Sequence, residues 1–464
     1  MIVDAHSTHL QAQIGTDHQY HPDISHQVMP SIVDHFVFLP CIGSRRSISS
    51  RLRIAGKSKT LGAPTSFKTR RHETVGMPNH GISMTMTTLA AADFAGSPLE
   101  IMGALDFDRR GAALSPRRLP DWTRPQINPM LDFMLRTPSG VRLRFATTAH
   151  TVRLTVLTTH MAGRSGRGGC AFDLACNGMV HTRRHHEGNQ LHFDPSGKVP
   201  PRIEPGEVYD VVFDGLGDEQ KNLSLWLPHN ALVELHALSV DGGEVEAPDP
   251  LGVHWIHHGS SISHCMEADI PTGTWPVVAG QAAGIDVTNL GLGGQCHLDP
   301  FMARTIRDLN PDFISIKAGI NIVNGDTMRE RVFLPLAHGF LDTLREAHPE
   351  VPILLISPIY CPSAEDHPGP TIPNAEGKFG TIDRPPALRE GALTLSRIRE
   401  LLSEVVISRN DPHLAYLSGL ELFGEDDAHD LPDDLHPNPT GYRRMGKRFA
   451  DRVFGDDGIL QSIR

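Results

Sequence analysis

Apolar and polar residues alternate along several short runs between about residues 86 and 248. A period of two places successive side chains on opposite faces of a strand, as in strands with one buried face. Clusters of Gly, Pro, Asn and Asp separate these runs, and helical periodicity is almost absent. The pattern predicts a β-sandwich, jelly-roll-like domain over 86–248. Its expected strands are residues 141–146, 152–157, 170–175, 208–213, 223–227 and 233–238.

From about residue 252 the pattern changes to strands that alternate with helical segments. Strand-like runs occupy residues 253–257, 285–290, 313–317, 353–357 and 414–417. Helix-like segments lie around 275–283, 299–309, 328–347, 388–409 and 440–454. This alternation is typical of a parallel sheet covered by helices on both faces. It predicts a three-layer α/β/α, flavodoxin-like domain with a five-stranded parallel sheet over 252–456.

Two segments stand apart from these domains. The connection 358–387 carries seven prolines and little periodicity, and a loop of that length in a compact domain is usually functional. We expect it to form part of the wall of a substrate pocket. Residues 1–85 hold eight of the 27 histidines and show no sustained period. We expect either a disordered extension or a mis-assigned start, with translation beginning at Met77, Met84 or Met86.

Composition and charge narrow the class of protein. The chain has 464 residues, 39% hydrophobic and 21% charged, which suits a soluble globular protein. Its formal net charge of −11 disfavours binding to a nucleic-acid backbone. No run of eighteen apolar residues predicts a membrane span. No basic region followed by an apolar stretch marks a signal peptide, so we expect a cytoplasmic location, with secretion left open if the start is mis-assigned. The six cysteines form no CxxC pair and are expected to be reduced thiols.

Polar residues follow the predicted strands of the second domain. Ser261 comes after the first strand, Gly294 after the second and Asn321 after the third, while Asp433 and His436 come some distance after the fifth. In open α/β sheets, ligands bind beyond the carboxyl ends of the strands. All five residues are therefore expected at one edge of the sheet.

These residue types suit acyl transfer. A serine hydroxyl becomes a good nucleophile when an adjacent base takes its proton, and a neutral histidine can do so near pH 7. A carboxylate such as Asp433 can hold the imidazole of His436 in one tautomer. The oxyanion of a tetrahedral intermediate needs fixed donors, which the N–H groups of Ser261 and Gly294 and the amide of Asn321 would supply.

The order Gly-x-Ser-Ile-Ser, a glycine-rich turn, Gly-x-Asn and Asp-x-x-His-Pro resembles the four blocks of the GDSL/SGNH hydrolase family. The resemblance covers about 200 residues, from 252 to 456. It implies that Ser261 is the nucleophile and an oxyanion donor, that Gly294 and Asn321 are further oxyanion donors, and that His436 is the base and Asp433 its orienting partner. No metal or organic cofactor is implied.

Two departures from the family pattern lie in the first and third blocks. Ser260 stands where the family has Asp, and Ile322 follows Asn321 where Asp is frequent. The family's Asp in the first block is not a member of the triad, so the nucleophile assignment holds. The β-rich domain ahead of the catalytic one resembles the two-domain layout of some SGNH carbohydrate esterases and acyltransferases.

Several of these residues allow another interpretation. Ser260 is the rival nucleophile, and Asp434 is the rival partner for the histidine. The glycines of 291–294 suggest a dinucleotide site, but Cys296 stands where that motif needs its third glycine. The histidines of 181–192 lie among charged residues, which favours a solvated hairpin over a metal site.

The sequence therefore predicts a serine esterase that hydrolyses a small acyl ester through an acyl-enzyme on Ser261, with His436 as general base. The first alternative is an acyltransferase, which passes the same acyl group to an alcohol or glycan acceptor. The second is a carbohydrate-binding protein with an inactive SGNH unit. The acyl chain, the alcohol, the role of the β-sandwich domain and the oligomeric state stay open.

Overall fold

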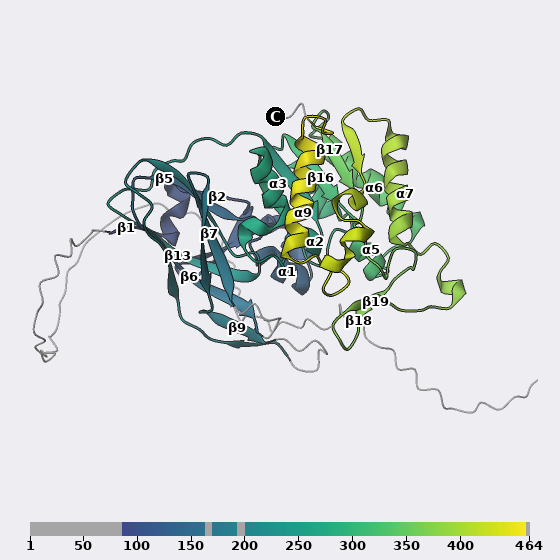
Figure 1. Cartoon of the computed structure of the whole chain (residues 1–464), viewed down its shortest axis with the longest axis horizontal. Helices are drawn as coiled ribbons and strands as arrows, with labels where there is room; N and C mark the ends of the chain where they lie inside the picture. Colours follow the sequence, from purple (N-terminus) through teal and green to yellow (C-terminus); the bar gives the residue numbers. More distant parts are fainter. Residues whose placement is uncertain (1–85, 163–168, 193–199, 461–464) are drawn as a thin grey trace, which may run out of the picture.

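The computed structural model describes residues 86–162, 169–192 and 200–460. The expectation for residues 1–85 lies outside the described residues. The described chain forms a β unit and an α/β unit, which lie side by side (Figure 1). Each unit has a hydrophobic core of its own.

The β unit is built from two sheets. The larger sheet contains β10 (Arg202–Glu204), β9 (Asn189–His192), β6 (Val152–Met161), β13 (Ala231–Asp241), β4 (Ala113–Arg117) and β3 (Asp106–Arg110) in this order, with β1 (Met86–Ala90) on β13 and β11 (Tyr209–Phe213) on β6. The second contains β2 (Glu100–Met102), β5 (Arg142–Thr147), β12 (Lys221–Trp226), β7 (Cys170–Cys176) and β8 (Met179–His185). Most strand pairs are antiparallel, and β6 with β9 is parallel.

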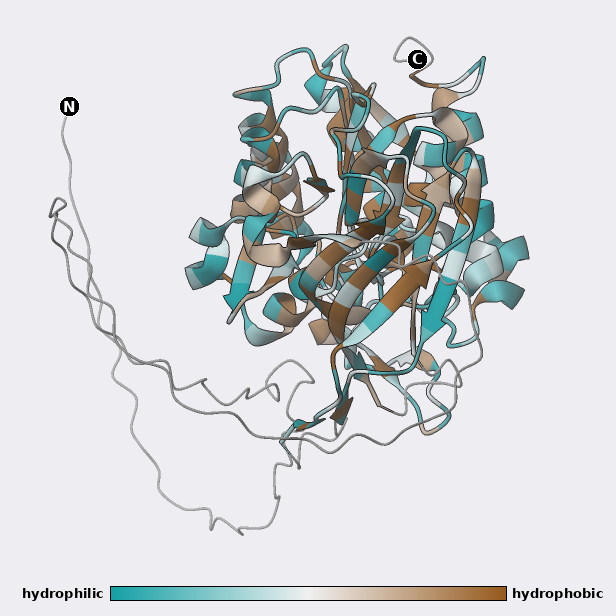
Figure 2. Cartoon of the chain, turned by 90° about the vertical axis from the view of Figure 1, so that its left-hand side faces the viewer, coloured by the Kyte–Doolittle hydropathy of each residue, from teal (hydrophilic) through white to brown (hydrophobic). Residues whose placement is uncertain are grey.

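The alternating pattern produces the core between these sheets. Val152 and Leu154 of β6 are fully buried and belong to one cluster with Leu143 and Phe145 of β5. Figure 2 shows the resulting hydrophobic and hydrophilic bands along the strands of the β unit. The six predicted strands are present. Seven further strands in the described part of the β unit were not predicted. They are three to seven residues long, and the longest of them, β8, shows no alternation of apolar and polar residues.

The α/β unit has a five-stranded parallel sheet in the order β15 (Asp286–Gly291), β14 (His254–Gly259), β16 (Phe313–Lys317), β17 (Ile353–Ile356) and β20 (Leu414–Leu417). Its main helices are α3 (Trp275–Ala283), α4 (Pro300–Arg307), α6 (Glu330–Arg345), α7 (Leu395–Arg409) and α9 (Pro439–Phe449). The predicted α/β/α fold class is confirmed.

Two residues of β14 whose side chains lie on opposite faces show that helices cover both faces of this sheet. The ring of Trp255 stacks on Phe449 of α9, with the ring centroids 4.9 Å apart. His258, on the opposite face, stacks on Phe340 of α6 at 6.2 Å. The sheet is therefore buried on both sides, as in other parallel sheets that helices cover on both faces. No helix of the described residues is long and apolar enough to cross a membrane.

The β unit contains a helix, α1 (Pro129–Arg136), so the expectation that helical segments are almost absent there was wrong for this segment. Helix α1 begins at Asn128, whose side chain accepts a hydrogen bond of 2.8 Å from the N–H of Leu131. Proline at the first helical position and asparagine before it are a common helix start, so this sequence signal was available. Phe133 and Met134 pack into the core of the α/β unit rather than into the sandwich.

Candidate active site

The predicted nucleophile lies at the start of a short helix. Helix α2 (Ser261–His264) follows β14 almost directly, at the carboxyl end of the sheet. Ser261 Oγ is 3.0 Å from Nε2 of His436. Ser260 Oγ, in contrast, is buried and has no hydrogen-bond partner among the described residues. The geometry thus favours Ser261 over Ser260 as the hydroxyl that a histidine can activate.

His436 and Asp433 lie in the loop before α9. His436 Nδ1 is 2.7 Å from Asp433 Oδ2. Since a carboxylate only accepts, Nδ1 carries the proton and the lone pair of Nε2 faces the serine. Asp433 Oδ1 also accepts from the backbone N–H groups of Leu435 at 3.0 Å and His436 at 2.7 Å. Asp434 points elsewhere and pairs with Lys378, Nζ to Oδ2, at 3.2 Å.

The environment of Asp433 keeps its carboxylate charged. Burial raises the pKa of the carboxyl, but the hydrogen bond and the charge of His436 lower it by more, aided by the N–H groups of His436 and Leu435. The net pKa of Asp433 lies below its ordinary value. The carboxylate is therefore an anion at neutral pH and can stabilise a positively charged imidazole.

The two remaining site residues come from neighbouring turns. Gly294 follows β15 and has a φ of 72°, a left-handed conformation that favours glycine. Asn321 lies in α5 (Ile320–Asn324), just after β16. Its Nδ2 donates a 2.8 Å hydrogen bond to the carbonyl of Gln295, the residue after Gly294. The structure thus links Asn321 directly to the turn that carries Gly294.

Sequence reasoning missed an aromatic neighbour of the histidine. Phe379 lies in β19 (Phe379–Thr381), which pairs with β18 (Thr371–Pro373) inside the connection 358–387. Its ring meets that of His436 edge to face, with centroids 5.8 Å apart, and its N–H donates to the carbonyl of Asp433 at 2.9 Å. This connection therefore contacts the proposed acid–base pair. Its lack of periodicity left no signal for the individual residue.

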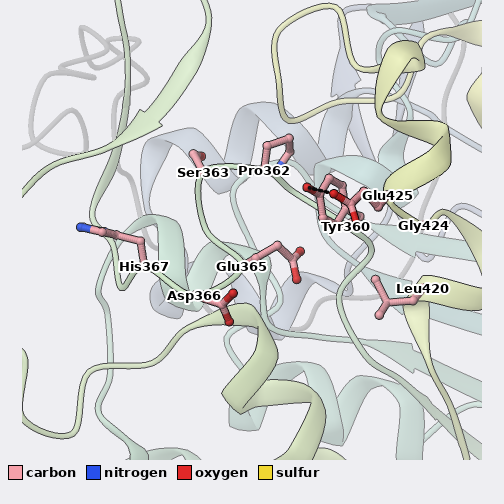
Figure 3. Close-up of a pocket in the computed structure, with 9 residues that line it drawn as sticks. All are labelled: Tyr360, Pro362, Ser363, Glu365, Asp366, His367, Leu420, Gly424 and Glu425. Carbon is pink, nitrogen blue, oxygen red and sulfur yellow. Dashed lines mark hydrogen bonds between the residues drawn. The ribbon is translucent and has the colours of Figure 1, made fainter.

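A cavity of about 680 Å³ opens at the start of the same connection (Figure 3). It is lined by Tyr360, Pro362, Ser363, Glu365, Asp366, His367, Leu420, Gly424 and Glu425. Ser261, Asp433 and His436 are not among its lining residues. Glu365 binds Arg399 through both carboxylate oxygens, at 2.6 and 2.8 Å, and Asp366 accepts from Ser396 at 2.8 Å. These two carboxylates are thus engaged in holding the loop.

The histidine-rich strands of the β unit show ion-pair geometry. His185 Nδ1 lies 3.2 Å from Glu187, and His192 Nε2 lies 3.0 Å from Glu204. Within the described ranges, no three or more His, Cys, Asp or Glu side chains are arranged to hold a metal ion. The turn between β7 and β8 is formed by Asn177 and Gly178, both with positive φ, as expected for a tight hairpin.

Comparison with known families defines the class of protein. Residues 258–444 match the model of the GDSL-like lipase/acylhydrolase family. The α/β unit therefore carries a GDSL-like lipase/acylhydrolase domain, which is the domain of a hydrolase enzyme.

Solved structures resemble both units together. The salicylyl-acyltransferase SsfX3 from a tetracycline biosynthetic pathway is 25% identical, and the match covers 82% of this chain and 99% of that chain with a TM-score of 0.67. A protein from Bacteroides ovatus, described as a GDSL-like lipase, is 17% identical over 79% of this chain and 96% of that chain, with a TM-score of 0.56. No curated protein matches the sequence. The coverage exceeds the α/β unit alone, so the likeness extends into the β unit.

Proposed function

We propose that this protein is a serine esterase that cleaves a small acyl ester through an acyl-enzyme on Ser261. The observation that supports this most directly is the continuous hydrogen-bonded row from Ser261 Oγ to His436 Nε2, and from His436 Nδ1 to Asp433 Oδ2, at 3.0 and 2.7 Å. These distances lie within the range in which a base can take a serine proton.

In the proposed mechanism, Ser261 Oγ forms a bond to the carbonyl carbon of the ester as its proton passes to His436 Nε2. The resulting imidazolium is stabilised by the Asp433 carboxylate and then protonates the departing alcohol. Water next attacks the acyl-enzyme, gives its proton to the same nitrogen, and releases the acid and the free serine. Every proton moves through His436, so a single base serves both halves of the reaction.

Three donors would stabilise the oxyanion in both tetrahedral intermediates. The N–H of Ser261 opens α2, where the first N–H groups have no partner within the helix. The turn at Gly294 lacks a side chain, so a substrate can approach its backbone closely. Asn321 Nδ2 uses one hydrogen for Gln295, and an amide has a second hydrogen to donate.

Acyl transfer to an alcohol is the second candidate function. It is favoured by the likeness to the salicylyl-acyltransferase SsfX3, which extends across 99% of that chain at 25% identity. Hydrolysis and transfer share the acyl-enzyme and differ in whether water or an alcohol reaches it. The proposed esterase would use water, whereas the transferase would need a bound acceptor, such as a phenol or a sugar hydroxyl.

A single series of measurements tests both candidates. A panel of p-nitrophenyl esters from acetyl to decanoyl should be turned over, and a fluorophosphonate should label Ser261, as located by peptide mass spectrometry. Ser261→Ala should abolish labelling and lower turnover by about 10⁴-fold or more. Ser260→Ala is the matched control and should keep both. Labelling that persists in Ser261→Ala and disappears in Ser260→Ala would move the nucleophile to Ser260.

The fate of the acyl group separates hydrolysis from transfer. The acyl-enzyme is formed from a p-nitrophenyl ester in the presence of millimolar sugars or phenolic alcohols, and free acid and new ester are quantified by mass spectrometry. Free acid should dominate for the esterase. New ester as the main product, at acceptor concentrations far below that of water, would assign the protein as an acyltransferase.

A further inference from the structure

A single arginine of the β unit connects α2, which carries the proposed nucleophile, with the end of β15. Strand β15 leads into residues 292–294, which we call the oxyanion turn. Arg118 follows β4 and is fully buried. Its Nη1 donates to the carbonyls of Gly291 at 2.6 Å and Asn289 at 3.2 Å, both in β15. Its Nη2 donates to the carbonyl of Met134 in α1 at 2.8 Å and contacts His264 Nδ1 in α2 at 3.1 Å. One guanidinium thus joins three separate elements.

The contact with α2 has a defined direction. His264 Nε2 lies 2.8 Å from the carbonyl of His229, which can only accept. Nε2 therefore carries the proton, and Nδ1 accepts from Arg118. Burial, and then the charge of Arg118, lower the pKa of His264 well below its ordinary value, so the ring is neutral and this arrangement persists at neutral pH.

The guanidinium is a buried charge with neutral partners. Burial alone lowers the pKa of Arg118 to about 9, so the group still carries its charge near pH 7. Every hydrogen-bond partner of Arg118 in the described ranges is a carbonyl or an imidazole nitrogen. A buried charge without a counterion is costly to the folded state, and an apolar side chain would join two units at a lower cost.

Helix α1 lies against the same turn. A Cβ atom added to Gly293 would come within 2.7 Å of Met134 Sδ, so the turn between β15 and Gly294 is in close contact with α1. Arg118 binds the carbonyl of that same methionine. The arginine therefore fixes both the strand end from which the turn emerges and the helix on which the turn rests.

We propose that Arg118 is a positioning residue for the oxyanion hole: by binding the end of β15, α1 and α2 at once, it sets the spacing between the N–H groups of Ser261 and Gly294. This inference rests on the proposed function. An oxyanion hole works through donors held in place before charge develops, and small displacements are expensive. Since the donors act mainly on the transition state, their displacement should lower kcat and leave KM nearly unchanged.

Arg142 provides a matched control at the same interface. It is buried, and its pKa is also lowered to about 9, by burial first and then by Arg144. It forms an ion pair with Asp286 and donates to the carbonyl of Val287 at 3.4 Å. These residues are at the beginning of β15, whereas Arg118 binds its end. Arg142 therefore joins the same two units without touching the oxyanion turn.

The experiment compares Arg118→Lys, Arg118→Met and Arg142→Lys in the full chain. Burst titration with a p-nitrophenyl ester counts competent sites, and kcat and KM are measured well below each melting temperature. Lysine keeps the charge but cannot reproduce the planar set of donors. Arg118→Lys should lower kcat by about tenfold or more with KM within about twofold, and Arg118→Met should lower it further. Arg142→Lys should lower the melting temperature and retain kcat.

Two results would overturn the inference. One is an equal loss of kcat in Arg118→Lys and Arg142→Lys, and the other is a wild-type kcat in either Arg118 variant. Either result would mean that Arg118 only stabilises the contact between the two units. If Arg118→Met does not fold, Arg118→Lys decides. A wild-type chain that neither reacts with fluorophosphonate nor turns over esters would overturn the proposed function as well, so the two failures are distinguishable.

Discussion

The carboxyl edge of the parallel sheet and the interface with the β unit both contain polar and charged side chains. These side chains differ in their exposure and in the groups that they bind. At the sheet edge, Ser261 and Asn321 are partly exposed, and Asp433 is paired with a histidine. At the interface, Arg118 and Arg142 are buried and bind backbone carbonyls of β15. The edge is built to meet a substrate, and the interface is built to fix the backbone behind it.

This difference indicates that the β unit is part of the enzyme's framework. A tethered binding module would meet its neighbour through an exposed, water-rich surface. Here Asp173 of β7 is fully buried and accepts from the N–H and the hydroxyl of Thr272, at 3.0 and 2.7 Å. Substitutions at the sheet edge should therefore change catalysis, while most substitutions at the interface should change stability. The following predictions test this distinction.

The largest expected effect among them is at Asp433. Asp433→Asn removes the anion that fixes the tautomer of His436, so kcat should fall by about 10³–10⁴-fold while the melting temperature changes little. Asp434→Asn is the control, since that carboxylate pairs with Lys378, and it should keep wild-type kcat. Steady-state kinetics on a p-nitrophenyl ester measures both. A greater loss in Asp434→Asn would transfer the role to Asp434.

The next effect is at Asn321. Removing one donor of the proposed oxyanion hole with Asn321→Ala should lower kcat by about 10²–10³-fold and leave KM nearly unchanged. Asn324→Ala, at the other end of α5, should retain most activity. An increased KM at unchanged kcat would instead make Asn321 a substrate-binding residue.

The pH dependence should show a single acid limb. The lowered pKa of Asp433 means that its carboxylate stays charged until the pH falls below the ordinary carboxyl range, and its contribution to stability is lost only there. Between about pH 5 and 8, Asp433 therefore stays ionised, and kcat/KM should fall about tenfold per pH unit once the general base becomes protonated. A second ionisation in this window would show that Asp433 titrates with the histidine.

The smallest expected effect is on stability alone. Asp173→Ala leaves the N–H and hydroxyl of Thr272 without their acceptor, which should cost about 1–3 kcal/mol of unfolding free energy and keep kcat. Asp210→Ala is the control, because Asp210 pairs with Arg153 at the exposed surface, and it should change stability by less than about 1 kcal/mol. Denaturant melts followed by fluorescence give both values. A loss of kcat in Asp173→Ala at full folding would contradict the division between edge and interface.

Local sequence patterns determined the α/β unit and the set of candidate residues. Strand β17 is a wholly apolar run whose burial follows from its composition, while β14 and β15 also bury polar residues such as His257 and Asn289. Parallel connections between the strands leave few possible arrangements. The order of strands then brings residues as distant as Ser261 and His436 to one edge, because all strands point the same way. The amino-acid sequence alone therefore predicted the fold class, and it also supplied the five residues that we propose for the site.

The tertiary structure decided what lies behind and above that site. The contact between Arg118 and Gly291 joins residues 173 positions apart, and no local period connects an arginine after one strand with a carbonyl at the end of another. The same holds for Phe379, which comes from a connection without a repeating pattern, and for Met134 against Gly293. Such contacts depend on how two units pack, and that packing is set by the summed shape of both surfaces rather than by any short segment.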